Sequence, residues 1–232
     1  ILAVNMPIRQ YPLILLFLFI LGCTRSNDKE PIAGQPSQVT KGNVEEGKKL
    51  YSSCIPCHGT TGEGDENLKT PTLVNSDTWY LYRQLMNFKR GIRGSSPSDT
   101  SGYQMATMVN ILKDSVDISH VVAYINSMPS VSLPALIAGD IKKGKRTYET
   151  ICGSCHGQAA RGNEKLNAPN LNGLDDWYIK RQVYSFKTGI RGTHPEDILG
   201  AQMIPMVALL TSDQVVDDVI AYIRLTAQVN TK

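Results

Sequence analysis

The sequence has little excess charge of either sign, no clear strand pattern and few cysteines. Its 232 residues include 24 basic and 21 acidic side chains, for a formal net charge of +3. Because this charge is mild and spread along the chain, no basic footprint for nucleic acid stands out. No segment alternates apolar and polar residues as a half-buried strand does. At 41% hydrophobic and 19% charged residues, the composition is typical of a globular protein and not of a disordered one.

A long hydrophobic run is missing from the N-terminal region as well. The apolar stretch Leu13–Leu21 has nine residues, whereas roughly 18 are needed to span a bilayer. A basic residue precedes this stretch, and a small residue and a polar segment follow it, as in a secretory signal. We therefore expect residues 1–22 to be a signal peptide and residues 23–40 to be a flexible tether. The letters ILGC also resemble a bacterial lipobox, which implies that Cys23 is acylated.

From the first cysteine pair onward, the chain repeats itself without a gap at an offset of 98 residues. CIPCHG at 54–59 returns as CGSCHG at 152–157, and GIRG at 91–94 returns at 189–192. Such a long gapless register indicates a duplicated domain. The two prolines of PSVSLPALI mark the boundary between the copies. We expect domain 1 at 41–129, a linker at 130–137 and domain 2 at 138–232.

Each half is predicted to be helical with long loops. Apolar residues recur at helical spacing in 77–90 and 175–187, and a glycine ends each segment. ISHVVAYINSM and QVVDDVIAYIRL predict an amphipathic closing helix in each half. A half of about 90 residues with two or three helices has only a thin core. Something other than side chains is therefore expected to fill it.

Apart from Cys23, all cysteines lie in two CxxCH stretches, and three kinds of site fit them. A structural zinc site needs four ligands, usually in two pairs from one short domain, whereas each half offers three. A thioredoxin-like dithiol is typical of a strand–helix unit and leaves the adjoining histidine without a purpose. CxxCH is the attachment signature of c-type haem, with two thioether links and the imidazole as proximal iron ligand. We therefore expect two covalently bound haem c groups, at Cys54, Cys57 and His58, and at Cys152, Cys155 and His156.

The ligand opposite the proximal histidine decides what a haem does. The two other histidines, His120 and His194, align with residues that are not histidines, so the repeat does not support them. GYQMATM and GAQMIPM each carry two methionines at equivalent positions. Two pairs of candidate ligands therefore satisfy the duplication: Met105 with Met203, and Met108 with Met206.

With these motifs, each half resembles a class I cytochrome c domain, and the tandem resembles the dihaem cytochrome c4 type. WYLYRQLMNFKRGIRG and WYIKRQVYSFKTGIRG are also similar to cytochrome c domains attached to haem–copper oxidases. The resemblance covers about residues 42–228 and implies an all-α fold of two tandem domains related by pseudo-twofold symmetry. In that family the axial methionine lies seven residues before the leucine that precedes the last helix. Met105 before Leu112 and Met203 before Leu210 match this spacing, which implies that they are the axial ligands.

The resemblance also implies supporting roles for residues that recur in both halves. A loop proline carbonyl accepts the other ring hydrogen of the proximal histidine and so orients the ring. An arginine neutralises haem propionates and a tryptophan donates to them. A glycine on the first helix meets an aromatic residue on the last, as Gly47 with Tyr124 and Gly144 with Tyr222. The implied haem-environment residues are Pro71, Pro169, Trp79, Trp177, Arg93 and Arg191.

Histidine–methionine ligation fills both axial positions and raises the reduction potential of the haem relative to ligation by two histidines. We therefore expect an electron carrier rather than an enzyme, on the periplasmic side of a bacterial membrane and anchored through Cys23. The resemblance implies a quinol-oxidising complex as donor and a terminal oxidase or reductase as acceptor. Two alternatives remain: a dihaem enzyme of the peroxidase or thiosulfate-oxidising type, with one open iron, and a fixed cytochrome subunit of an oxidase complex.

Overall fold

A computed structural model describes residues 42–228, and their regular structure is helical apart from two isolated β-bridges. The predicted signal peptide at 1–22, the predicted acylation site Cys23 and the tether at 23–40 lie outside the described residues. The prediction of an all-α fold is confirmed. The helices are α1 Val44–Tyr51, α2 Ile55–His58, α3 Thr78–Lys89, α4 Thr100–Met108, η2 Val109–Ile111, α5 Ser115–Ser127, α6 Ile141–Ile151, α7 Gly153–His156, η3 Glu164–Leu166, α8 Asp176–Lys187, α9 Ile198–Ala208 and α10 Asp213–Gln228.

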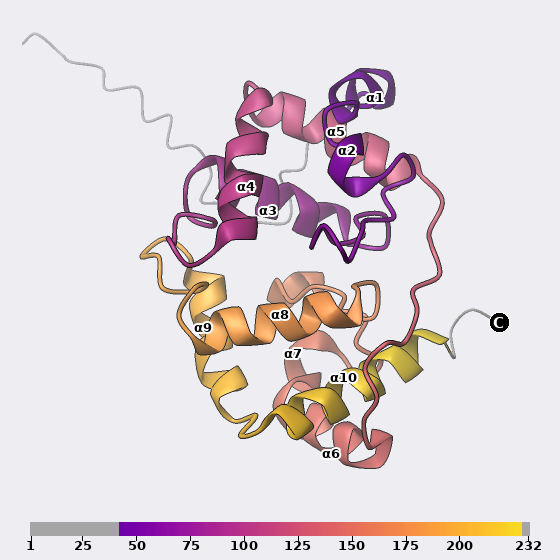
Figure 1. Cartoon of the computed structure of the whole chain (residues 1–232), viewed down its shortest axis with the longest axis vertical. Coiled ribbons are helices and arrows are strands. Elements are labelled where there is room, and N and C mark those ends of the chain that lie inside the picture. Colours follow the sequence, from indigo (N-terminus) through magenta and orange to yellow (C-terminus); the bar gives the residue numbers. More distant parts are fainter. Residues whose placement is uncertain (1–41, 229–232) are drawn as a thin grey trace, which may run out of the picture. The chain divides into compact units, whose positions relative to one another are not determined.

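In the first half, α1 packs against the closing helix α5 (Figure 1). The two backbones approach closely at Gly47, where a Cβ atom would lie 1.9 Å from the carbonyl oxygen of His120 and 2.8 Å from the Cβ of Tyr124. This is the glycine–aromatic contact that the family resemblance implied. Tyr51 at the end of α1 and Ile118 on α5 are fully buried. The helix pair therefore forms one side of a small core.

The second half repeats this arrangement with α6 and α10 (Figure 1). A Cβ atom on Gly144 would lie 1.8 Å from the carbonyl oxygen of Asp218, so here too the backbones touch. The closest atoms to Gly144 belong to Asp218 and Val219 rather than to Tyr222. The ring of Tyr222 instead packs against Tyr148, with 5.3 Å between the ring centroids.

The methionine segments form helices that the sequence analysis did not predict. Both α4 and α9 begin at an aspartate N-cap, since Asp99 accepts from the amide of Gly102 at 2.9 Å and Asp197 from that of Gly200 at 3.0 Å. Capping of this kind satisfies amides that the first helical turn leaves unpaired. The loops after these helices are held by lysines from α3 and α8, through the bonds Lys89 Nζ to Leu112 O and Lys187 Nζ to Leu210 O.

Residues 129–140 contain no helix and connect the two halves. Asn75 exchanges two hydrogen bonds with the backbone of Val131, of 2.8 and 3.1 Å. The buried carboxylate of Asp176 accepts from the amides of Leu136 and Ile137. The connecting segment is therefore bonded to both halves. The proposed linker at 130–137 falls within this segment, and its exact bounds stay a prediction.

Candidate haem sites

Each CxxCH stretch forms one helical turn that gathers its thiols and imidazole. Cys54 is the N-cap of α2, and the amide of His58 donates to the Cys54 carbonyl at 2.9 Å. His156 donates to Cys152 at the same distance at the start of α7. Residues three and four apart on a helix lie on one face. Each turn therefore presents two cysteines and a histidine on one side.

The two proximal histidines are buried and held in one tautomer. His58 and His156 are 7% and 6% exposed, and their Nδ1 atoms lie 3.0 Å from Pro71 O and 2.8 Å from Pro169 O. A carbonyl oxygen can only accept, so Nδ1 carries the hydrogen and the Nε2 lone pair is free for a metal. Burial lowers the pKa of both imidazoles, although the bonds to the prolines act in the opposite direction. The neutral ligand form is therefore favoured.

The partly buried thiols of Cys54 and Cys152 are not poised for thiol–disulfide exchange. Burial, with a smaller contribution from the neighbouring cysteine, raises the pKa of Cys54 to about 11 and of Cys152 to about 12. Catalytic dithiols instead have a thiol whose pKa is lowered. Within residues 42–228 no three His, Cys, Asp or Glu side chains converge as ligands of a metal ion would. This donor set suits attachment to a cofactor better than it suits a dithiol or a zinc site.

A buried tyrosine fixes the loop that leaves each motif. The hydroxyl of Tyr51 donates to Gly59 O at 2.9 Å, and that of Tyr148 donates to Gly157 O at 2.8 Å. Both glycines have positive φ values, 78° and 75°. The sequence analysis missed this pair because the tyrosines precede the gapless part of the repeat and lie 97 residues apart, at 51 and 148.

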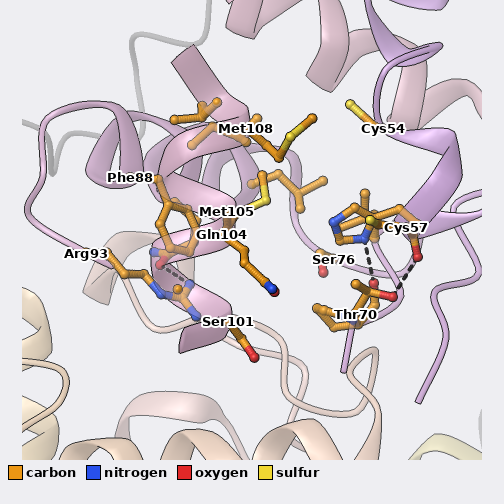
Figure 2. Close-up of a pocket in the computed structure, with 18 of the residues that line it drawn as sticks. Cys54, Cys57, Thr70, Ser76, Phe88, Arg93, Ser101, Gln104, Met105 and Met108 are labelled. Carbon is orange, nitrogen blue, oxygen red and sulfur yellow. Dashed lines mark hydrogen bonds between the residues drawn. The ribbon is translucent and has the colours of Figure 1, made fainter. Parts of the chain in front are cut away.

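A cavity opens beside each motif. In the first half, Cys54 and Cys57 lie on one side of the cavity and Met105 and Met108 on the other (Figure 2). Its wall is largely apolar, and apolar residues at equivalent positions line the second cavity. An apolar, flat porphyrin fits these walls and would enlarge the small core of each half. The shared wall residues are Leu81, Phe88, Val109, Leu112, Val121 and Ile125 in the first cavity and Ile179, Phe186, Val207, Leu210, Val219 and Ile223 in the second.

All four candidate methionines line the cavities. Met108 and Met206 are 42% and 36% exposed, whereas Met105 and Met203 are less exposed. Met105 also packs against the buried core of its half. Each cavity therefore offers two thioethers on the wall facing the cysteines, and the more buried one is the predicted ligand.

Arg93 and Arg191, which are predicted to bind haem propionates, lie on the cavity walls, and each has one N–H group without a hydrogen-bond partner in the protein. Arg93 and Arg191 are each 8% exposed, and their Nη1 atoms donate to Gln84 and Gln182, both at 2.7 Å. The buried Nε of each arginine has no partner in the protein. A buried cation with an unpaired N–H at the edge of an apolar cavity fits a haem propionate. The residues present therefore fit the group that CxxCH predicts.

The two tryptophans lie elsewhere. Neither Trp79 nor Trp177 lines either of these two cavities. Their rings instead lie against guanidinium groups, with Arg83 Cζ 4.8 Å from the Trp79 ring centre and Arg181 Cζ 5.2 Å from that of Trp177. The expectation that they donate to propionates gains no support. These cation–π contacts instead help to place the two arginines.

Those arginines link the halves reciprocally. Arg83 donates to the carbonyl oxygen of Asn167 at 3.1 Å, and Arg181 donates to that of Lys69 at 2.9 Å. Both acceptor residues have a left-handed backbone, with φ values of 56° and 59°. Each bond is the counterpart of the other at the 98-residue offset. The predicted pseudo-twofold relation between the halves is present in these contacts.

Each cavity is also completed by the opposite half. Tyr178 and Gln182 from α8 line the first cavity, and Tyr80 and Gln84 from α3 line the second. One contact breaks the symmetry, because the hydroxyl of Tyr178 accepts from Arg93 at 2.9 Å. Sequence reasoning did not find these cross-domain walls, although Gln84 and Gln182 recur within the repeat.

The two spare histidines have structural contacts. His120 Nδ1 accepts from the amide of Asn43 at 2.8 Å, which joins the start of α1 to α5. His194 Nδ1 accepts from the amide of Glu196 at 3.2 Å. Neither residue lines either of the two cavities beside the CxxCH turns. Their placement agrees with the expectation that they are not iron ligands.

Comparisons with known proteins agree with this site. The cytochrome c family model matches residues 44–129 and 141–227. The Cbb3-type cytochrome c oxidase subunit FixP of Azorhizobium caulinodans is 30% identical over 145 residues, covering 61% of this chain and 47% of that protein. The thiosulfate dehydrogenase electron acceptor of Stutzerimonas stutzeri is 25% identical over 222 residues, covering 87% of this chain and 96% of that protein.

A solved structure shows the same tandem arrangement. Reduced recombinant cytochrome c4 from Pseudomonas stutzeri matches with a TM-score of 0.59 and 25% identity, covering 79% of this chain and 98% of that one. The chain spans about half the length of the FixP proteins that it matches. Both matched segments contain one CxxCH turn with its cavity. The chain therefore belongs to the cytochrome c family, with two tandem domains like those of cytochrome c4 and one covalently bound haem c in each.

Proposed function

We propose that this protein is a one-electron carrier of a bacterial respiratory chain, and not an enzyme. It takes electrons from a quinol-oxidising complex and passes them toward a terminal oxidase or reductase. The observation that carries the proposal is the pair of equivalent cavities, each with an imidazole on one wall and thioethers on the other. A haem iron bound between two such ligands supplies one-electron exchange and has no free position for a substrate.

We propose His58 with Met105, and His156 with Met203, as the axial pairs. Support comes from burial, since these methionines are less exposed than Met108. The seven-residue spacing to the following leucine supports the same choice.

The surrounding residues suit this task. The proline carbonyls hold each imidazole in one orientation, which limits rearrangement when the oxidation state changes. The apolar walls keep water away, and a neutral thioether opposite the histidine favours the ferrous state. Arg93 and Arg191 would balance the charge of propionates.

One observation bears on the enzymatic alternative. The chain resembles a protein named as an electron acceptor of thiosulfate dehydrogenase over almost its whole length. That name describes a protein that receives electrons, which agrees better with a carrier than with the catalytic centre. The similarity to a protein named as an oxidase subunit supports the other alternative, a fixed position in a complex.

For localisation, we propose the periplasmic side of a bacterial membrane, with a lipid anchor on Cys23. The support is the signal-like and lipobox-like sequence before that residue. Mass spectrometry of the membrane-extracted protein tests it: an N-terminal diacylated Cys23 supports the anchor, and an unmodified Cys23 removes it.

Reconstituted electron transfer tests the function. The reduced protein is mixed with a purified terminal oxidase, and oxidation of both haems is followed by stopped-flow absorption. A carrier is oxidised at each turnover and reduced again by a quinol-oxidising complex. Thiosulfate added to the oxidised protein alone separates the alternatives, because a carrier stays oxidised whereas a thiosulfate-oxidising enzyme reduces its own haems.

A further inference from the structure

Two aspartates at helix N-termini do not cap their own helices. Asp77 precedes α3 and Asp175 precedes α8, and neither side chain bonds to the first turn of its helix. An aspartate at this position usually accepts from an amide two or three residues ahead. Within residues 42–228, the N-cap aspartates that do so are Asp99, Asp114, Asp140 and Asp197.

The carboxylates of Asp77 and Asp175 bind the opposite domain instead. Asp175 Oδ2 accepts from the amide of Thr72 at 2.8 Å, and Asp77 Oδ2 accepts from the amide of Asn170 at 2.7 Å. The two bonds are counterparts at the 98-residue offset. Domain 2 thus provides an acceptor to a loop of domain 1, and domain 1 does the same for domain 2.

The amides that they bind belong to the peptide groups that orient the proximal histidines. The N–H of Thr72 and the C=O of Pro71 are the two ends of one peptide group, and Pro71 O lies 3.0 Å from His58 Nδ1. The peptide between Pro169 and Asn170 is used in the same way, with His156 Nδ1 at 2.8 Å. A continuous relay therefore runs from a carboxylate of one domain, through a peptide group, to the imidazole of the other.

We propose that Asp77 and Asp175 are positioning residues that lower the reduction potential of the haem in the opposite domain. A carboxylate at the N–H end polarises the peptide, and the C=O end becomes a stronger acceptor. A stronger acceptor at Nδ1 makes the imidazole a better electron donor to the metal. The negative charge itself also favours the ferric state. Both effects act in the same direction.

The surroundings strengthen this effect. Thr72 is 1% exposed, and both aspartates are partly buried. Desolvation raises the pKa of Asp77 and Asp175, whereas the amide bonds from Asn170 and Thr72 act to lower it. Charges and hydrogen bonds act more strongly where water is excluded. The relay rests on the proposed coordination by His58 and His156, but not on any particular redox partner.

The test is a spectroelectrochemical titration of the intact dihaem protein with Asp175→Asn and Asp77→Asn. Asparagine keeps an acceptor oxygen and removes the charge. With Asp175→Asn, the haem at Cys54 and Cys57 is expected to titrate at a higher potential, while the other is unchanged. With Asp77→Asn, the haem at Cys152 and Cys155 is expected to titrate at a higher potential, while the haem at Cys54 and Cys57 is unchanged. The reduced-to-oxidised ratio at fixed potential should rise roughly three- to tenfold, where tenfold corresponds to 59 mV for a one-electron couple.

Matched variants separate this effect from loss of charge in general. Asp114→Asn and Asp140→Asn remove the same charge from N-caps that serve their own helices, and both haems should keep their potentials. Asp175→Glu keeps the charge and should stay closer to the wild type than Asp175→Asn. NMR signals of each haem, assigned through its cysteine attachments, show which haem has a changed reduction potential.

The proposal is contradicted if the reduction potential changes only for the haem of the substituted domain, if both potentials change equally, or if neither potential changes. Hydrogen exchange in the wild-type protein adds a test without any variant, since the Thr72 amide should be protected and free exchange there overturns the relay. Retained methionine–iron charge-transfer absorption in Asp175→Asn shows that coordination is intact. Its absence in the wild type would instead contradict the proposed ligands.

Discussion

The hydroxyl of Tyr51 donates to the carbonyl oxygen of Gly59 at 2.9 Å, so the helix before the first CxxCH turn holds the loop after it. Tyr51 is fully buried, and burial raises its pKa well above the ordinary value. The hydroxyl therefore stays protonated, and remains a donor, at neutral pH. This hydrogen bond joins the two ends of the segment 51–59, which contains the CxxCH motif.

Tyr51→Phe should lower the free energy of unfolding by about 1 to 2 kcal/mol, because the partly buried Gly59 carbonyl loses its hydrogen-bond partner. Equilibrium denaturation of the holoprotein, followed by far-ultraviolet circular dichroism, measures this loss. Tyr103→Phe is the control, since Tyr103 is 66% exposed. Equal stability of the Tyr51→Phe variant and the wild type would contradict the role given to this bond.

Gly47→Ala should destabilise the first domain by about 3 kcal/mol or more, because the new Cβ would force α1 away from the His120 carbonyl. Gly153→Ala is a matched control. Its Cβ would meet nothing closer than 3.5 Å, and Ile55 stands at the equivalent position of the first motif. Thermal unfolding of both variants measures the difference, and a small loss at Gly47 would mean that the helices separate easily.

Much of the site could be predicted from the sequence because its chemistry is local. CxxCH gathers three functional groups in one turn, and the 98-residue repeat marks the proline loops without any structure. The helices α4 and α9 were not predicted because the glycine in each helix and the proline inside α9 weaken the helical pattern. Trp79 was assigned a donor role that its position beneath Arg83 does not support.

The cross-domain contacts could not be predicted because they join residues far apart in the chain. Asp175 and Thr72 are separated by 103 residues, and Asp77 and Asn170 by 93. No local pattern says which polar side chain meets the other half. The repeat does preserve both aspartates, yet an aspartate before a helix is fully explained as an N-cap. Only the unused caps in the structure reveal the second role.

Met105→Ala and Met203→Ala should each abolish the methionine-to-iron charge-transfer absorption of one haem and leave that of the other. Each substitution removes one proposed axial thioether, whereas Met108→Ala and Met206→Ala remove only the more exposed neighbour. Near-infrared and visible spectra of the four oxidised variants measure the outcome. Loss of the band in Met108→Ala with retention in Met105→Ala would reverse the assignment.

Asp114 links pH to stability in a defined direction. Its carboxylate accepts from the amides of Asp117 and Val116, and these bonds hold its pKa below the usual range. Because the pKa is lower in the folded state than in the unfolded chain, the stabilisation is present above the unfolded value of about 3.9. It is lost as the pH falls through the folded value. In Asp114→Asn, urea midpoints should depend less on pH in this acidic range, and an unchanged slope would contradict the capping role.

Carbon monoxide binding to the reduced protein tests the central claim, that each haem iron is closed by a ligand on both faces. We predict that visible spectra of the reduced wild-type protein are the same with and without carbon monoxide at neutral pH. Met105→Ala serves as the positive control, because it should open one iron and bind the gas. A carbon monoxide adduct formed rapidly by the wild-type protein would contradict the account and favour an enzyme with an open haem.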